Sequence, residues 1–120
     1  MNINESAENY LETILILSKT CPMVRSIDIA TKLGFKKSSV SVAMKNLREN
    51  KYITVEGNGS IHLTDVGTEV AEMIYERHTL LSKWLESLGV SKDVANQDAC
   101  KIEHVISQES FIALKRHIQL

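Results

Sequence analysis

The sequence predicts a mainly α-helical fold with one small β-hairpin. The 120 residues include one proline and five glycines, so few positions interrupt helices. Apolar residues recur at helical spacing over most of the chain. The exceptions are two short runs, Tyr52–Glu56 and Ser60–Thr64, in which apolar and polar residues alternate on either side of Gly57-Asn58-Gly59. This pattern is typical of a hairpin.

The N-terminal elements predict a winged helix. An apolar stripe predicts a first helix over Ser6–Ser18, which Thr20-Cys21-Pro22 ends. A short helix over Ser26–Leu33 is followed by Gly34, a residue suited to a left-handed helix end. A third helix carries Val40, Ala43, Met44 and Leu47, with Ser38 or a neighbour as its expected N-cap. Two short helices joined by a glycine turn form a helix-turn-helix, and the hairpin adds the wing.

The C-terminal part is predicted to be helical throughout. Thr64 is the expected N-cap of a long helix that runs towards Leu88 and ends at Gly89. Further helices are expected at about Ser91–Ser107 and at Glu109–Ile118. The boundary is placed inside the long helix, with a winged-helix DNA-binding domain at 1–74 and a helical domain at 75–120.

Composition excludes several classes of protein. No apolar run approaches the roughly 18 residues that a membrane span needs, and the first ten residues do not form a secretory signal. Cys21 and Cys100 are the only cysteines, which do not make a disulfide framework, so a reducing cytoplasm is the expected location. No pattern of a catalytic cleft appears, so an enzyme is not expected.

The net charge of −1 hides a local basic region. Between Lys32 and Lys51 there are six basic residues and one acidic residue, a pattern that indicates phosphate binding or simply a solvated helix face. The predicted DNA contacts are Lys36, Lys37, Ser38, Ser39, Ser41, Val42, Lys45 and Arg48. The basic members would meet phosphates, and Val42 would either touch a thymine methyl group or pack under the wing.

The segment "DACKIEHV" places three metal-ligand types on one helix. At about 100° per residue, Cys100, Glu103 and His104 fall within an arc of about 100°. Thiolate, carboxylate and imidazole together suit a divalent first-row metal, although a cysteine facing the core beside solvated neighbours would give the same pattern. Further candidates are His78 on the long helix and the pair Asn9 and Glu12 on the first helix. An ion that joined these helices would act as a switch.

Five segments resemble one known family over nearly the whole chain. They are "SAENYLETILIL", "SSVSVAMKNL", "HLTDVG", "YERHTLL" and "DACKIEHVIS". Together they resemble the diphtheria-toxin-repressor-like, metal-dependent transcriptional repressors, which include the manganese-transport regulators. The pattern D-x-C-x-x-E-H resembles the iron-responsive branch, whereas the manganese branch has a second glutamate at the position of Cys100.

The resemblance implies a set of metal ligands that mixes the two branches. Cys100, Glu103, His104 and His78 match ligand positions of the family. Asn9 stands where the family has an aspartate or methionine ligand, and Glu12 matches a ligand of the manganese branch. At two positions of the iron branch's accessory site this chain has Ser82 and Asn96, so either that site is lost or His78 belongs to a site with Glu12. The chain ends at Leu120 without the SH3-like domain of longer members.

The function implied is a repressor of metal-uptake genes. The C-terminal helices would form a homodimer that binds double-stranded DNA at a palindromic operator, once Fe(II) or, as second choice, Mn(II) orders the first helix. A thiolate ligand favours Fe(II) over Mn(II). Two other interpretations are a winged-helix regulator that has lost metal control and a metalloenzyme. The second lacks an extra general base.

Overall fold

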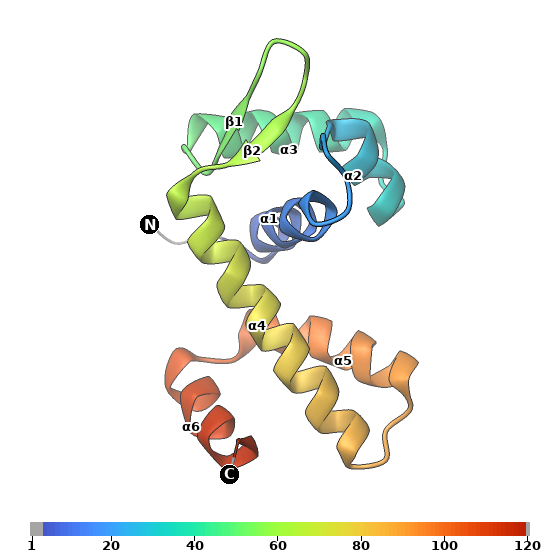
Figure 1. Ribbon diagram of the computed structural model, residues 1–120, viewed down its shortest axis with the longest axis vertical. Coiled ribbons are helices and arrows are strands. Elements are labelled where there is room, and N and C mark those ends of the chain that lie inside the picture. Colours follow the sequence, from blue (N-terminus) through green and yellow to red (C-terminus); the bar gives the residue numbers. More distant parts are fainter. Residues whose placement is uncertain (1–3, 120) are drawn as a thin grey trace. The chain divides into compact units, whose positions relative to one another are not determined.

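The computed structural model describes residues 4–119, which form six helices and one antiparallel hairpin (Figure 1). In chain order the elements are α1 (Glu5–Ser18), α2 (Ser26–Leu33), α3 (Lys37–Glu49), β1 (Ile53–Val55), β2 (Ile61–Leu63), α4 (Asp65–Ser87), α5 (Lys92–Val105) and α6 (Gln108–Ile118). The predicted mainly α-helical winged-helix fold is therefore confirmed.

Side-chain caps start most of the helices. Asn4 Oδ1 accepts a hydrogen bond from the Ala7 amide at 2.8 Å at the start of α1, and Ser91 and Ser107 cap α5 and α6 in the same way. The expectation that Ser38 caps α3 is wrong, because Ser38 already lies inside the helix. The turn after α2 is so short that Lys36 is the N-cap, and its carbonyl accepts from the Val40 amide.

The helix-turn-helix and the wing follow from two left-handed glycines. Gly34 ends α2 with a φ of 70°, and Gly59 has a φ of 88° in the turn between the strands. A hydrogen bond from the Gly59 amide to the Glu56 carbonyl closes this turn at 2.9 Å. The strands pair antiparallel with Ile53 opposite Leu63. Each strand is shorter than predicted by one residue at each end.

The start of α4 packs tightly against the short segment between α3 and β1. Thr64 Oγ1 accepts from the Gly67 amide at 3.1 Å, which confirms Thr64 as a cap, and it also lies 2.8 Å from the Lys51 carbonyl. A Cβ atom at Gly67 would stand 2.0 Å from the Tyr52 carbonyl oxygen. Only glycine therefore fits at position 67, because any side chain would overlap the backbone there.

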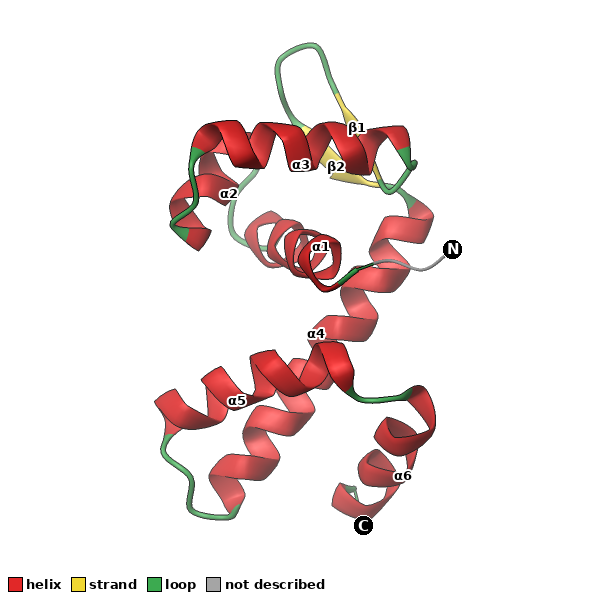
Figure 2. Ribbon diagram, turned by 180° about the vertical axis from the view of Figure 1, so that it is seen from behind, coloured by secondary structure: helices red, strands yellow, loops and turns green. Residues whose placement is uncertain are grey.

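The chain divides into two compact units within α4. Unit 1 ends at Glu72 and unit 2 begins at Met73. The core of unit 1 is one continuous apolar cluster drawn from α1, α2, α3, the hairpin and the start of α4. Unit 2 contains the rest of α4 with α5 alongside it, and α6 (Figure 2). None of the helices described over residues 4–119 is long and apolar enough to cross a membrane.

Candidate nucleic-acid interface and metal centre

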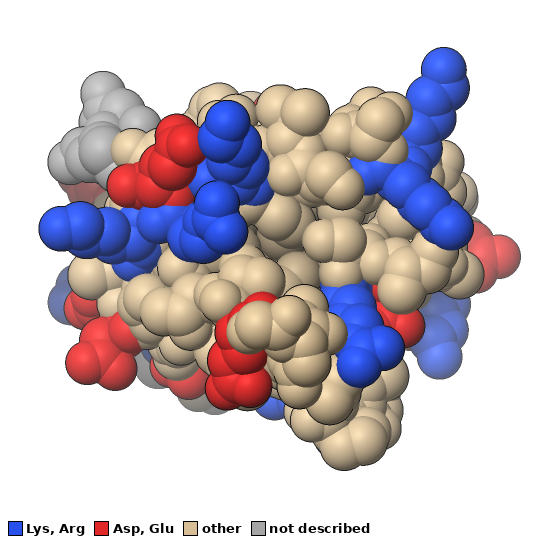
Figure 3. Space-filling view, turned by 90° about the horizontal axis from the view of Figure 1, so that it is seen from above, with Lys and Arg blue, Asp and Glu red and all other residues tan. Residues whose placement is uncertain are grey.

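All eight predicted DNA contacts lie on α3 or just before it, and all are exposed. The helix directs Val40, Met44 and Leu47 into the core, which leaves the small, hydroxylated and basic side chains outside. Val42 is 61% exposed, so it does not pack under the wing. Seen from above α3 and the hairpin, Lys and Arg side chains gather in groups around an uncharged centre (Figure 3).

A shallow groove runs along one side of α3. Its lining residues are Ser26, Ser41, Met44, Lys45, Arg48 and Val55. Lys45 and Arg48 share its wall with Ser26, the first residue of α2. The sequence alone did not indicate that Ser26 and Val55 lie beside this surface. The signal available for Ser26 was its place at the start of a helix.

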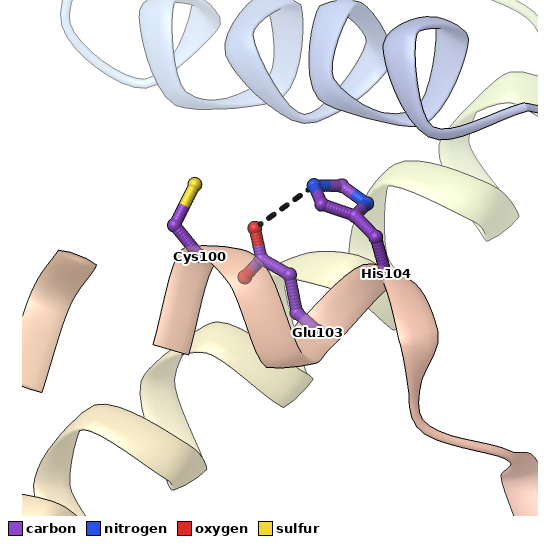
Figure 4. Close-up of side chains that lie close together, drawn as sticks. All are labelled: Cys100, Glu103 and His104. Carbon is purple, nitrogen blue, oxygen red and sulfur yellow. Dashed lines mark ion pairs between the residues drawn. The ribbon is translucent and has the colours of Figure 1, made fainter. Parts of the chain in front are cut away.

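The predicted ligands on α5 converge as their spacing requires. One ligand atom from each of Cys100, Glu103 and His104 lies within 4.8 Å of the other two. Figure 4 shows the three side chains projecting from consecutive turns of α5, with His104 Nε2 3.3 Å from Glu103 Oε1. Glu103 is completely buried, the His104 side chain is 2% exposed, and Cys100 is exposed.

His78 joins this group from α4. Its Nδ1 atom lies 3.0 Å from Glu103 Oε2, so two imidazoles flank one carboxylate. Within the described part of the chain, Glu103 Oε1 accepts no hydrogen bond. His104 Nε2 lies 3.3 Å from this oxygen without forming a hydrogen bond to it. A buried carboxylate oxygen that accepts no hydrogen bond is costly, and a cation bound there would stabilise it. The donor set of oxygen, nitrogen and sulfur therefore fits a divalent transition metal.

The other predicted ligands lie on α1 in unit 1. Glu12 is only 5% exposed although it is charged, and the Asn9 carbonyl accepts a hydrogen bond from Thr13 Oγ1. Their part in a metal site stays a prediction. In unit 2, Ser82 is buried with its hydroxyl directed to the Thr79 carbonyl, and Asn96 is exposed.

Arg77, the residue before His78, is a further buried polar residue near this group that the sequence did not single out. Its side chain is only 6% exposed, and it hydrogen bonds to three oxygens around the end of α5. The segment "YERHTLL" contained it, but an arginine on a helix is usually solvent-exposed. Neither its burial nor its partners can be inferred from helical spacing.

A winged helix with an exposed basic recognition helix, followed by a helical unit with a metal-ligand cluster, defines a DNA-binding regulator that responds to metal. Two sequence models of one family match the chain. The model described as "Iron dependent repressor, N-terminal DNA binding domain" matches residues 2–61. The model described as "Iron dependent repressor, metal binding and dimerisation domain" matches residues 64–119. The chain belongs to this family, that of the diphtheria-toxin-repressor-like, metal-dependent transcriptional regulators.

Individual relatives agree with this assignment. The chain is 33% identical over 115 residues to an uncharacterized HTH-type transcriptional regulator of Methanocaldococcus jannaschii, covering 94% of this chain and 92% of the relative. It is 32% identical over 114 residues to the HTH-type transcriptional regulator MntR of Listeria welshimeri, covering 95% and 80%. These relatives are named as transcriptional regulators, not enzymes.

Solved structures share the fold. One is titled a manganese-dependent transcriptional repressor in complex with manganese, with a TM-score of 0.86 and 25% identity. The match covers 94% of this chain and 52% of that one, so the present chain spans about half its length. The structure of ScaR with bound Zn²⁺ gives a TM-score of 0.79 at 22% identity, with 94% and 53% covered.

Proposed function

We propose that the protein is a repressor of metal-uptake genes that binds a palindromic operator as a homodimer when Fe(II), or as second choice Mn(II), is bound. The observation that carries this proposal is the group formed by Cys100, Glu103 and His104, in which a buried carboxylate oxygen lacks a hydrogen-bond donor. Solved structures titled as a manganese regulator and as a manganese-dependent transcriptional repressor support Mn(II) as the alternative ion.

The ligands proposed for the ion come from three helices. Cys100, Glu103 and His104 on α5 and His78 on α4 supply sulfur, oxygen and nitrogen, and Glu12 and Asn9 on α1 supply further oxygens. When bound, the ion supplies the positive charge that holds these groups together. Because thiolate is a soft ligand, Cys100 favours Fe(II) over Mn(II).

The regulatory step proposed is the ordering of α1 by the ion. Metal-binding free energy becomes folding free energy when the ligands come from segments that are otherwise held weakly. A dimer whose two winged helices are fixed at one separation matches two half-sites of a palindrome. The ion would then raise operator affinity without touching DNA.

On the DNA, the exposed face of α3 would enter the major groove. Ser38, Ser39 and Ser41 are small enough to avoid steric conflict there, and Val42 presents a methyl group suited to thymine. The basic residues Lys36, Lys37, Lys45 and Arg48 would contact phosphates and fix the register.

The test measures operator binding under anaerobic conditions, by fluorescence anisotropy on a duplex selected from random sequence in the presence of Fe(II). We expect excess chelator to lower the affinity at least about tenfold, the range of typical allosteric coupling. Cys100→Ala is expected to abolish most of the Fe(II) response while leaving far-UV circular dichroism unchanged. Cys21→Ala, which removes the other thiol, is the matched control and should behave as wild type.

Two outcomes would contradict the proposal. Equal operator affinity with chelator and with metal would identify a winged-helix regulator that has lost metal control. An unchanged Fe(II) response in Cys100→Ala would remove the thiolate from the ligand set and with it the preference for iron.

A further inference from the structure

A buried guanidinium lies at the end of α5. Arg77 Nη1 donates to the Glu103 carbonyl at 3.1 Å and to the Ile106 carbonyl at 2.8 Å. Its Nη2 atom donates to Gln108 Oε1 at 2.9 Å, and the guanidinium carbon lies 5.4 Å from the centroid of the Phe111 ring. One side chain from α4 therefore contacts both α5 and α6.

These contacts cap α5. The last carbonyls of a helix have no partners inside the helix and carry partial negative charge. Many helices satisfy them with a left-handed residue, usually glycine, but at the end of α5 Ile106 is extended, with a ψ of 135°. Arg77 supplies both the missing donors and the positive charge. Among the described residues no carboxylate forms an ion pair with it, so its hydrogen-bond acceptors are these neutral oxygens.

The capped turn is the one that carries the proposed metal ligands. Glu103 is held at two points by neighbouring residues of α4: Arg77 binds its carbonyl, and His78 binds its carboxylate. His104 follows in the same turn. Two hydrogen bonds from Arg77 hold this final turn, so the turn would fray without the cap. A mispositioned ligand lowers metal affinity.

We propose that Arg77 is a positioning residue of the metal centre. It holds the last turn of α5 so that Glu103 and His104 face the ion, and through Gln108 and Phe111 it joins that turn to α6. This inference rests on the proposed function, because it requires a metal at Cys100, Glu103 and His104. It predicts that metal affinity depends on a side chain that does not touch the metal.

The test is an anaerobic Co(II) titration of the full chain, which reports Cys100 through thiolate-to-cobalt charge-transfer absorption. We expect Arg77→Met to lower Co(II) affinity tenfold or more. Arg77→Lys should give a smaller loss, because an ammonium keeps the charge but cannot donate through a planar fork. Arg116→Met, which removes an exposed arginine of α6, is the matched control and should not differ from wild type.

The sign of the effect separates positioning from simple electrostatics. A buried positive charge repels a divalent cation, so its loss alone would raise Co(II) affinity. An unchanged or raised affinity in Arg77→Met therefore overturns the inference. A lower unfolding temperature with an unaltered cobalt spectrum and affinity would show a merely structural role and overturn it as well.

Two further results keep the test decisive. If Arg77→Met does not fold, Arg77→Lys decides, and wild-type affinity in that variant overturns the inference. If the wild-type protein shows no charge-transfer band that Cys100→Ala removes, the proposed metal site itself is wrong. A missing band in the wild-type protein contradicts the proposed function, whereas the results with the Arg77 variants contradict only the inference about Arg77.

Discussion

The two units of the molecule are stabilised in different ways. The interior of unit 1 is a continuous cluster of buried apolar side chains, including Leu11, Ile14 and Ile29. In unit 2 the buried apolar residues, such as Ile74 and Phe111, share the interior with charged or polar ones. These are Arg77, Ser82 and Glu103. Unit 1 also buries Glu12, Thr13 and Ser60, but among a much larger set of buried apolar residues.

The difference shows where each unit obtains its stability. Burying apolar surface stabilises unit 1 by about 25 cal/mol per Å² without any ligand. A buried carboxylate and a buried guanidinium each carry a desolvation cost that their partners must offset. Unit 2 therefore depends on hydrogen bonds and, under the proposed function, on an ion. We expect unit 1 to respond to core mutations and unit 2 to respond to metal.

The largest expected effect is in the core of unit 1. Leu11 is 0% exposed in the apolar cluster, so Leu11→Ala should lower the free energy of unfolding by about 2–5 kcal/mol. The loss combines lost apolar burial with a residual cavity. Urea denaturation followed by far-UV circular dichroism, in chelator and in Mn(II), measures it.

The comparison requires this loss to be the same in both conditions. Ile27→Ala, at an exposed apolar position of α2 in the same unit, should change the free energy by no more than about 0.5 kcal/mol. If Mn(II) largely removed the defect of Leu11→Ala, the stability of unit 1 would depend on metal and the contrast between the units would fail.

The second effect is stabilisation by metal. A ligand at 100 times its dissociation constant stabilises the folded state by about 2.7 kcal/mol. Trp84 is the only tryptophan in the sequence and lies on α4 within unit 2, so its fluorescence in urea reports this unit. We expect Mn(II) or Fe(II) to raise the free energy of unfolding measured by this fluorescence by that amount.

Glu103→Gln is the variant for this measurement, because it replaces the carboxylate at the centre of the group while keeping its shape. The metal-induced shift should fall below about 0.5 kcal/mol, within the range of neutral surface changes. A full shift in Glu103→Gln would place the ion elsewhere and leave the polar interior of unit 2 without its proposed function.

The fold was largely predictable from the sequence because its signals are local. Helical spacing, Gly34, Thr64 and the Gly57-Asn58-Gly59 turn each act within a few residues. The N-cap of α3 was not predictable from such local signals. A serine within a few positions of a helix start suggests a cap, whereas the length of the preceding turn decides which residue occupies it.

The candidate site was predictable only where one helix supplies it. The positions of Cys100, Glu103 and His104 follow from a period of 3.6 residues, and their ligand atoms do lie close together. The contact between His78 and Glu103 joins two helices. The sequence offered His78 as a further candidate ligand, and the family resemblance gave it a ligand position, but helical spacing on one element could not place it beside Glu103. Arg77 could not be predicted because two of its three hydrogen bonds go to backbone carbonyls, which carry no sequence signal, and the third goes to Gln108 on another helix.

The smallest effect is on the DNA-reading surface of unit 1. Each phosphate contact contributes about 0.9 to the slope of log affinity against log salt. Lys45 is exposed on α3 and lines the groove beside Arg48, so Lys45→Ala should reduce this slope by about one such contact in saturating metal. Lys83→Ala removes an exposed lysine of unit 2 and should leave the slope unchanged.

Because both variants lose one positive charge, a slope that fell equally in both would show that net charge governs DNA binding. A slope that fell in neither would remove Lys45 from the interface, and the groove on α3 would no longer distinguish unit 1 as the DNA-reading unit.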